Sequence, residues 1–327
     1  MRKQLKFAGE QPVVSTTYAG EFAGKYIAAA LLSAKTLDNK NITIMPNVKY
    51  KEVIQKIAVD SIVNDASCNF VTSGTVALSE RVIEPKELQV NLELCKQNFV
   101  ASWEALQLGY SAFDEIPKDF TDYLISYVGG KVAEATEISI WRGSAATNGQ
   151  FAGLLPALSA SAAAGGAGAV VKSPASGSIN SSNVLAKLDA LVSAIPNTVY
   201  GKEDLVIYVP TNVVKAYTQA LSGVQIANGA QSALAANGVD NKMTVGAKTL
   251  NFNGIDLVWS PGMTDSYLVA AQKSNLFFGT GLLSDYNEVR VLDMAQIDGS
   301  QNFRIIMRYT AATQFGIGED IVIAIPS

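Results

Sequence analysis

Apolar and polar side chains alternate most regularly in residues 87–99, ELQVNLELCKQNF. The apolar positions that share one face are Leu88, Val90, Leu92 and Leu94. A period of two predicts a β-strand with one buried face. Residues 42–86 are rich in β-branched side chains and carry a turn signal at Ser73-Gly74. We therefore expect long strands over residues 42–100, joined as an extended hairpin that needs a surface to lie on, because an isolated two-stranded hairpin is marginal in water.

A helical period follows in residues 117–142. Its apolar positions are Phe120, Leu124, Tyr127, Val132, Ala135 and Ile138. Pro117 suits a first helical position and Gly143 suits the end of the helix. Shorter helices are predicted at 20–36, 184–195 and 211–221, the last ending at Gly223.

The remaining pattern is mostly strand. The run DLVIYVP (204–210) predicts a buried strand, and Asn253-Gly254 predicts a tight hairpin turn. Four further strands are expected in SYLVAA, EVRVLDM, NFRIIMRYTAATQFG and DIVIAI. Residues 159–183 are nearly all small and are predicted to form a loop. Because helices and strands do not alternate regularly, the predicted fold class is α+β.

Composition adds a hint about partners. The chain has 327 residues, of which 48% are hydrophobic and only 17% charged, with a net charge of −4. Such a chain can bury a large core and still have apolar surface for contacts with other chains. The charge gives no sign of a nucleic-acid-binding surface. No apolar run approaches the roughly 20 residues that span a bilayer, so we expect a cytoplasmic protein without a membrane anchor.

Candidate chemistry is sparse. The absence of histidine excludes Ser-His-Asp and Cys-His catalysis and His-ligated metals. Cys68 and Cys95 cannot build a zinc site, and ordinary thiols are expected. Counting from Gly166 puts Lys172 and Ser173 at P-loop spacing, but the pattern has Val171 where it needs glycine. We therefore expect no enzyme activity, no catalytic residue, no cofactor and no metal.

Three stretches carry a resemblance to a known family. They are IWRGSAATNGQFAGLLPAL (140–158), SNLFFGTGLLSDYNEVRVLDM (274–294) and RYTAATQFGIGEDIVIA (308–324). With the order of the predicted elements, they resemble the major capsid proteins of tailed bacteriophages, which have the Hong Kong 97 (HK97) fold. The resemblance covers nearly the whole chain.

The resemblance implies a domain plan. The expected parts are an N-terminal arm (1–40), an extended E-loop hairpin (41–102), a peripheral domain (103–196) with spine helix 117–142 and small-residue loop 159–183, an axial domain (197–285), and return strands with a C-terminal strand (286–327).

It also implies function and contacts. Hexamers and pentamers of the chain would close an icosahedral virion shell around double-stranded DNA, without sequence-specific binding, after assembly in the bacterial cytoplasm. Expected partners are other copies, a portal protein, and separate scaffolding, protease and decoration proteins. The residues implied in contacts between copies are Leu88, Val90, Leu92, Leu94, Trp141, Arg308 and Tyr309.

Some relatives differ in ways that bear on this chain. They carry a charged helical scaffolding segment before the arm, and we expect none here. Others cross-link a lysine to an asparagine of a neighbour. The candidates here are Lys49, Lys51, Lys56 and Lys86 with Asn287 or Asn302. No motif singles out any of these residues, so we expect no cross-links.

Three alternatives remain open. A disulfide between Cys68 and Cys95 is conceivable, because they lie on the two sides of the predicted hairpin. An encapsulin-type nanocompartment shell, which encloses a cargo enzyme, is the main rival function. A soluble enzyme is the lesser one.

Overall fold

The computed structural model describes residues 16–18, 34–48, 50–60, 65, 68, 75–95, 118–166, 168–227, 250–281, 289–294, 297, 299–300 and 302–326. The chain divides into two compact units. Unit 1 comprises residues 1–31, 87–132 and 282–309, and unit 2 comprises residues 32–86, 133–281 and 310–327. Most of the helix predicted at 20–36 lies outside the described residues. At its end, the structure has the short helix α2 (Lys35–Asp38).

Unit 1 is built on antiparallel strands. β1 (Thr16–Tyr18) pairs with β12 (Val289–Asp293), which pairs with the first part of β13 (Asn302–Phe315). β5 (Lys86–Cys95), most of which belongs to this unit, also pairs with β13. The strands predicted in EVRVLDM and NFRIIMRYTAATQFG are thereby confirmed, as is the strand predicted in 87–99 as far as Cys95, beyond which it lies outside the described residues.

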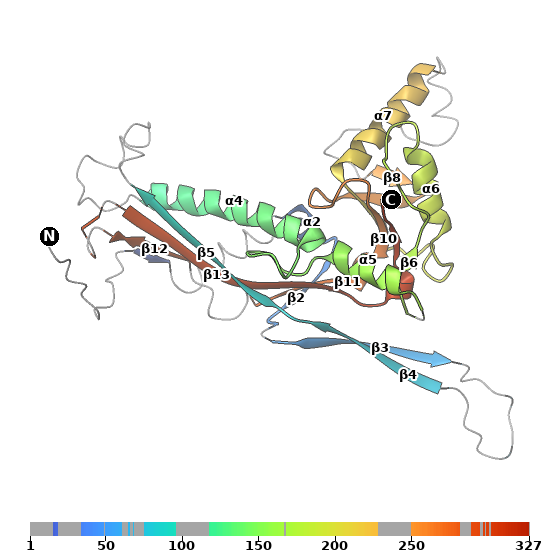
Figure 1. Ribbon diagram of the computed structural model, residues 1–327, viewed down its shortest axis with the longest axis horizontal. Helices are drawn as coiled ribbons and strands as arrows, with labels where there is room; N and C mark the ends of the chain where they lie inside the picture. Colours follow the sequence, from blue (N-terminus) through green and yellow to red (C-terminus); the bar gives the residue numbers. More distant parts are fainter. Residues whose placement is uncertain are drawn as a thin grey trace. The chain divides into compact units, whose positions relative to one another are not determined.

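A mixed sheet with two covering helices forms the main core of unit 2. Its strand order is β6 (Val171–Lys172), β14 (Val322–Ala324), β10 (Leu268–Gln272), β7 (Leu205–Val209), β9 (Ile255–Trp259) and β8 (Leu250–Phe252). Helices α6 (Val184–Ser193) and α7 (Thr211–Ala227) pack on it and share its apolar core (Figure 1). All five residues of β7 are buried, as the continuous apolar run predicted. The 250–259 hairpin turns at Asn253 and Gly254, both with positive φ, as predicted.

A second group of strands in unit 2 joins β2 (Thr43–Pro46), β11 (Leu276–Thr280) and the end of β13. β11 runs parallel to β2 and antiparallel to residues 311–315. From this group a long hairpin continues, made of β3 (Glu52–Asp60) and β4 (Thr75–Ile83), paired from Glu52↔Ile83 to Asp60↔Thr75 (Figure 1). An extended hairpin was predicted here, although β5 is a separate strand that pairs elsewhere.

The predicted long helix is α4 (Lys118–Arg142). It ends at Gly143, where a Cβ atom would lie 2.4 Å from the Phe151 carbonyl oxygen and 2.5 Å from that of Ser139. Gly143 N–H donates to the Ser139 carbonyl, and Gly153 N–H donates to the Gly143 carbonyl at 2.9 Å. Glycine is needed here for close backbone approach, which lets the following loop close on the end of the helix.

Two predictions were wrong. Residues 159–164 belong to helix α5 (Leu154–Ala164), not to a loop, because alanine is the best helix former and Gly165 first offers a stop. Helix α7 continues past Gly223 to Ala227, since an internal glycine costs only about 1 kcal/mol.

Short 3-10 turns follow β10 at η2 (Lys273–Asn275) and β13 at η4 (Gly318–Asp320).

Candidate functional site

The root of hairpin β3–β4 is fixed by apolar packing. Ile83, 1% exposed, shares a small core with Val48 and Ala312. A Cβ atom on Gly279 would lie 2.8 Å from Cδ1 of Ile83. A side chain at 279 would push the end of the Ile83 side chain aside, so this residue pair helps to set where the hairpin leaves the strands of unit 2.

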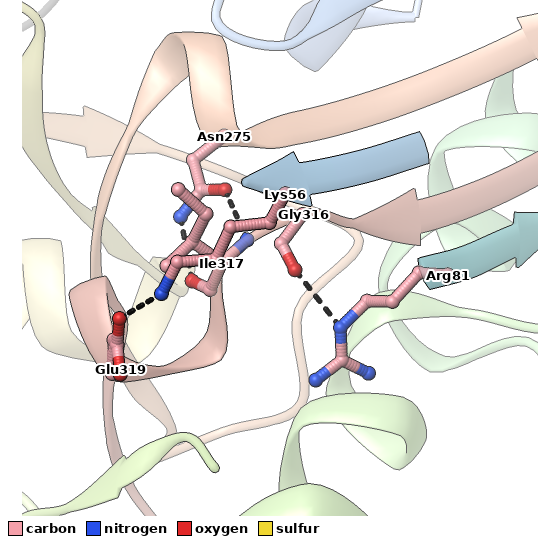
Figure 2. A network of polar contacts seen from close by, with 6 residues as sticks. All are labelled: Lys56, Arg81, Asn275, Gly316, Ile317 and Glu319. Carbon is pink, nitrogen blue, oxygen red and sulfur yellow. Dashed lines mark hydrogen bonds and ion pairs between the residues drawn. The ribbon is translucent and has the colours of Figure 1, made fainter. Parts of the chain in front are cut away.

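Polar contacts continue outward from the root along β4. The Gln314 side-chain amide donates to the Val82 carbonyl at 2.9 Å. Arg81 Nε donates to the Gly316 carbonyl at 2.9 Å (Figure 2). Its guanidinium lies 3.9 Å from the centre of the Phe315 ring. Burial lowers the pKa of Arg81, but an arginine stays charged at any ordinary pH. Arg81 therefore holds both a backbone carbonyl and an aromatic face.

Strand β3 makes the matching contact. Lys56 Nζ forms an ion pair with Glu319, in the turn after β13 (Figure 2). The side chains are 26% and 50% exposed, so solvent reaches both charges.

Asn275 holds the turn that carries these partners. Its side chain accepts from Ile317 N–H at 2.7 Å and donates to the Ile317 carbonyl at 2.8 Å, while its own carbonyl accepts from Gly316 N–H at 3.0 Å (Figure 2). A Cβ atom on Gly316 would lie 2.8 Å from the Asn275 side-chain oxygen. The buried Asn275 thus makes the turn a fixed platform beside the hairpin.

Trp141, expected at a contact between copies, is instead completely buried in unit 2. Its indole packs on Tyr208, with ring centroids 5.1 Å apart, and donates to Thr36 Oγ1 at 2.9 Å. Thr36 donates in turn to buried Glu137, through its hydroxyl at 2.5 Å and its N–H at 3.0 Å. Tyr208 donates to the Asn41 carbonyl, and burial, with a smaller effect of Asp204, raises its pKa. This network ties residues 36–41 to the end of α4.

The other predicted contact residues lie on β5 and β13. Leu88 and Tyr309 are buried, Val90 and Leu94 are half-buried, and Leu92 and Arg308 are exposed. Leu92 and Arg308 both line a shallow groove with the Glu93–Arg304 ion pair, in which the two atoms lie 3.0 Å apart. Of the predicted residues, these two have the side chains most open to a second copy.

The cross-link candidates that the structure describes already have partners. Lys51 pairs with Glu84 at 3.1 Å, and the Lys86 ammonium donates to three carbonyls of the loop after α4, those of Ala145, Thr147 and Gln150. Asn302 donates to Glu93 at 2.7 Å. Lys49 and Asn287 lie outside the described residues. Nothing therefore favours a cross-link at Lys51, Lys56, Lys86 or Asn302.

The two cysteines and the P-loop-like spacing form no reactive site in the described residues. Cys68 and Cys95 are both free thiols in this structure. Lys172 and Ser173 do not follow a phosphate loop: Lys172 lies in β6, and Ser173 N–H donates to the Ile323 carbonyl. Over the described ranges, no three His, Cys, Asp or Glu residues gather as metal ligands, and no helix has the length and apolar character to cross a membrane.

Sequence reasoning missed the residues that hold the hairpin. Lys56 was noted only as a possible cross-link donor, and Arg81, Asn275 and Glu319 were not singled out. The one available signal was Gly316 beside Phe315, quoted in the C-terminal stretch without a role.

Comparisons with known proteins give the fold. No protein-family model matches the sequence, and no curated protein does. Among solved structures, the capsid of an empty GTA particle matches with a TM-score of 0.54 at 11% identity, over 100% of this chain and 96% of that one. The capsid of Myoviridae phage XM1 matches at 0.53 and 13%, over 97% of both chains. A satellite phage P4 procapsid that includes size determination (Sid) protein matches at 0.52 and 12%, over 93% and 99%. The chain has the mixed α and β, HK97-like fold of these capsid chains, as the resemblance led us to expect.

Proposed function

We propose that this chain is a major capsid protein, which assembles into hexamers and pentamers of an icosahedral shell around the double-stranded DNA of a tailed phage or similar particle. The observation that carries the proposal is the extent of the fold likeness. It covers 100% of this chain and 96% of a GTA capsid chain, so neither has a large part that the other lacks.

The hairpin supports the same proposal. Near its base it exposes Tyr50, Val53 and Val82, at 85%, 45% and 43%. Apolar surface on a two-stranded excursion is costly in an isolated chain and is covered when a neighbouring copy lies against it.

The parts of the chain then take the roles that the resemblance implied. Residues 1–40 act as the N-terminal arm, β3–β4 as the E-loop and α4 as the spine helix. The sheet β6-β14-β10-β7-β9-β8 with its covering helices α6 and α7, here called the α6–α7 sheet, acts as the axial domain. Since α6 packs in the same core as β7 and α7, we place it with the axial part, although the resemblance implied an axial domain that begins at residue 197. Leu92 and Arg308 are the proposed contact residues. The proposed role is structural, without catalysis.

Electron microscopy of the expressed chain, alone and with its candidate scaffolding protein, tests the proposal. We expect closed icosahedral shells, and particles from infected cells should contain DNA by their 260/280 nm absorbance ratio. Shells that hold a protein cargo and no nucleic acid would instead favour a compartment shell. A discrete monomer or dimer under every condition would refute both readings.

A variant pair makes the test specific to the hairpin. Val53→Asp puts a charge on the exposed base of the hairpin and should abolish shells. Val53→Thr keeps the β-branched shape without a charge and should still assemble.

A further inference from the structure

One segment of unit 2 follows the hairpin outward from its root. Residues 312–319 contact it at four successive points. These contacts are Ala312 with Ile83, Gln314 with Val82, Phe315 and Gly316 with Arg81, and Glu319 with Lys56. Among the described side chains, Lys56 makes the contact farthest from the root. The hairpin is therefore held along a line, and Glu319 marks its outer end.

The strand register gives the lever arm of this last contact. Ile83 is paired with Glu52, and Lys56 is paired with Ser79, four residue pairs farther out. At about 3.3 Å per residue, Lys56 lies about 13 Å from the root, and the last pair, Asp60↔Thr75, lies about 26 Å from it. A swing about Ile83 would move the outer pair about twice as far as it moves Lys56.

The two polar contacts differ in what can open them. Arg81 bonds to a backbone carbonyl and rests on an aromatic ring, so it has little dependence on a partner charge. The Lys56–Glu319 pair is between two charges that solvent reaches, and salt weakens such a pair. Its contribution to an equilibrium is a factor of about 1.5–5. Such a contact is strong enough to bias the hairpin and weak enough to be released.

Glu319 follows a turn that Asn275 fixes to the strands of unit 2. Asn275 holds the preceding turn through three hydrogen bonds, and Gly316 has no room for a side chain. Movement of the hairpin is therefore expected to separate Lys56 from Glu319 instead of carrying the turn along.

We propose that the Lys56–Glu319 pair is a releasable stop that sets the direction in which hairpin β3–β4 leaves unit 2. While the stop is closed, the outer hairpin stays within reach of one position on a neighbouring copy. Release frees the part of the hairpin beyond Arg81, which stays bonded to Gly316, to change direction. The direction of the hairpin, and with it the geometry of the shell, depends on two exposed charges. This inference rests on the proposed function, because the direction of the hairpin matters only where the hairpin binds a neighbouring copy.

The test compares two ion pairs of the same hairpin. Lys56→Met and Glu319→Gln each break the stop. Lys51→Met and Glu84→Gln break a pair between the residue before β3 and the residue after β4, and they leave the contacts with the 312–319 segment intact. Each variant in either set removes one charge, so the general effect of losing a charge is matched.

Hydrogen exchange of the unassembled chain is the first measurement. Breaking the stop should speed amide exchange at 52–60 and 75–83 by about 2–5-fold, with exchange of the α6–α7 sheet unchanged. The Lys51 and Glu84 variants should change it by less than half as much. The charge swap Lys56→Glu/Glu319→Lys should restore the original rates, and 1 M salt should remove the difference between the original chain and Lys56→Met.

Particle geometry is the second measurement. Lys56→Met should broaden the distribution of particle diameters or leave shells unclosed, and the charge swap should narrow it again. Equal exchange rates and equal particles in the two sets would overturn the stop. If the unmodified chain forms no shell while the exchange difference is present, the proposed function fails and the stop stands.

Discussion

Replacing Thr36 tests whether the buried hydroxyl network of unit 2 is worth what its geometry implies. The Thr36 hydroxyl accepts from Trp141 Nε1–H at 2.9 Å and donates to Glu137 at 2.5 Å, and all three residues are buried. Thr36→Val keeps the shape and removes the hydroxyl. The indole N–H then has no acceptor and one carboxylate oxygen loses a donor, while the Thr36 N–H bond to Glu137 is kept.

The expected cost is large for a single oxygen atom. The indole N–H left without a partner costs about 1–3 kcal/mol, and the hydrogen bond lost by Glu137, which keeps the Thr36 N–H, costs about 1 kcal/mol more. Thr36→Val should therefore lower the free energy of unfolding by about 2–4 kcal/mol. Thr36→Ser keeps the hydroxyl and loses one methyl group, which costs about 1 kcal/mol. The two variants should therefore differ by about 2 kcal/mol.

Urea unfolding of the unassembled chain, followed by tryptophan fluorescence, measures the difference. With a slope of about 3 kcal/mol/M, the midpoints should be about 0.7 M apart. Trp141→Phe should also cost less in the Thr36→Val background than in the original chain, because the indole N–H has already lost its acceptor. Equal midpoints and slopes for Thr36→Val and Thr36→Ser would refute the reasoning.

Three further predictions concern other parts of unit 2. Gly262→Ala puts a Cβ atom 2.1 Å from the Glu137 carbonyl oxygen and should cost about 3 kcal/mol in thermal unfolding, whereas Gly149→Ala meets no atom and pays only for a positive φ, about 1 kcal/mol. Burial alone would raise the pKa of Asp204, but hydrogen bonds to its carboxylate lower it below 3.8, so its stabilising effect is present above that pH and is lost as the pH falls. At neutral pH the free energy of unfolding should be larger for the original chain than for Asp204→Asn, and this difference should disappear below about pH 4. A difference that stays constant with pH would contradict a lowered pKa of Asp204. Lys86→Met removes the ammonium from three loop carbonyls and should speed amide exchange in 144–150 alone; unchanged exchange there would show that the loop does not depend on it.

Local pattern was sufficient for most elements of the fold. The period of α4 located the helix to within one residue, and Asn253-Gly254 located a turn whose backbone only such residues favour. The errors came where one residue type is compatible with two kinds of secondary structure. Alanine and serine after residue 158 were interpreted as loop because they are small, yet alanine also favours helix, and Leu158 anchors that helix in the core.

The candidate site was less accessible to prediction because its partners are far apart in sequence. Lys56 and Glu319 are 263 residues apart, and Trp141 and Thr36 are 105 apart. No spacing rule relates such residues, and each side chain alone is compatible with a solvated or a paired state. The resemblance implied that Trp141 lies at a contact between copies, but an aromatic side chain suits a core as well as an interface. In this chain the Thr36 hydroxyl accepts the buried indole N–H.

Many of the contacts that hold unit 2 together join a side chain to a main-chain atom. Arg81 bonds to the carbonyl of Gly316, Lys86 to three loop carbonyls, Tyr208 to that of Asn41, and Thr313 to that of Ala152. A carbonyl is supplied by whichever amino acid occupies the position, so each contact constrains the choice of one residue instead of two. Such a framework can drift far in sequence while its geometry persists. The capsid chains that match this fold share only 11–13% of their residues with it and align with 93–100% of its length, a combination that such a framework allows.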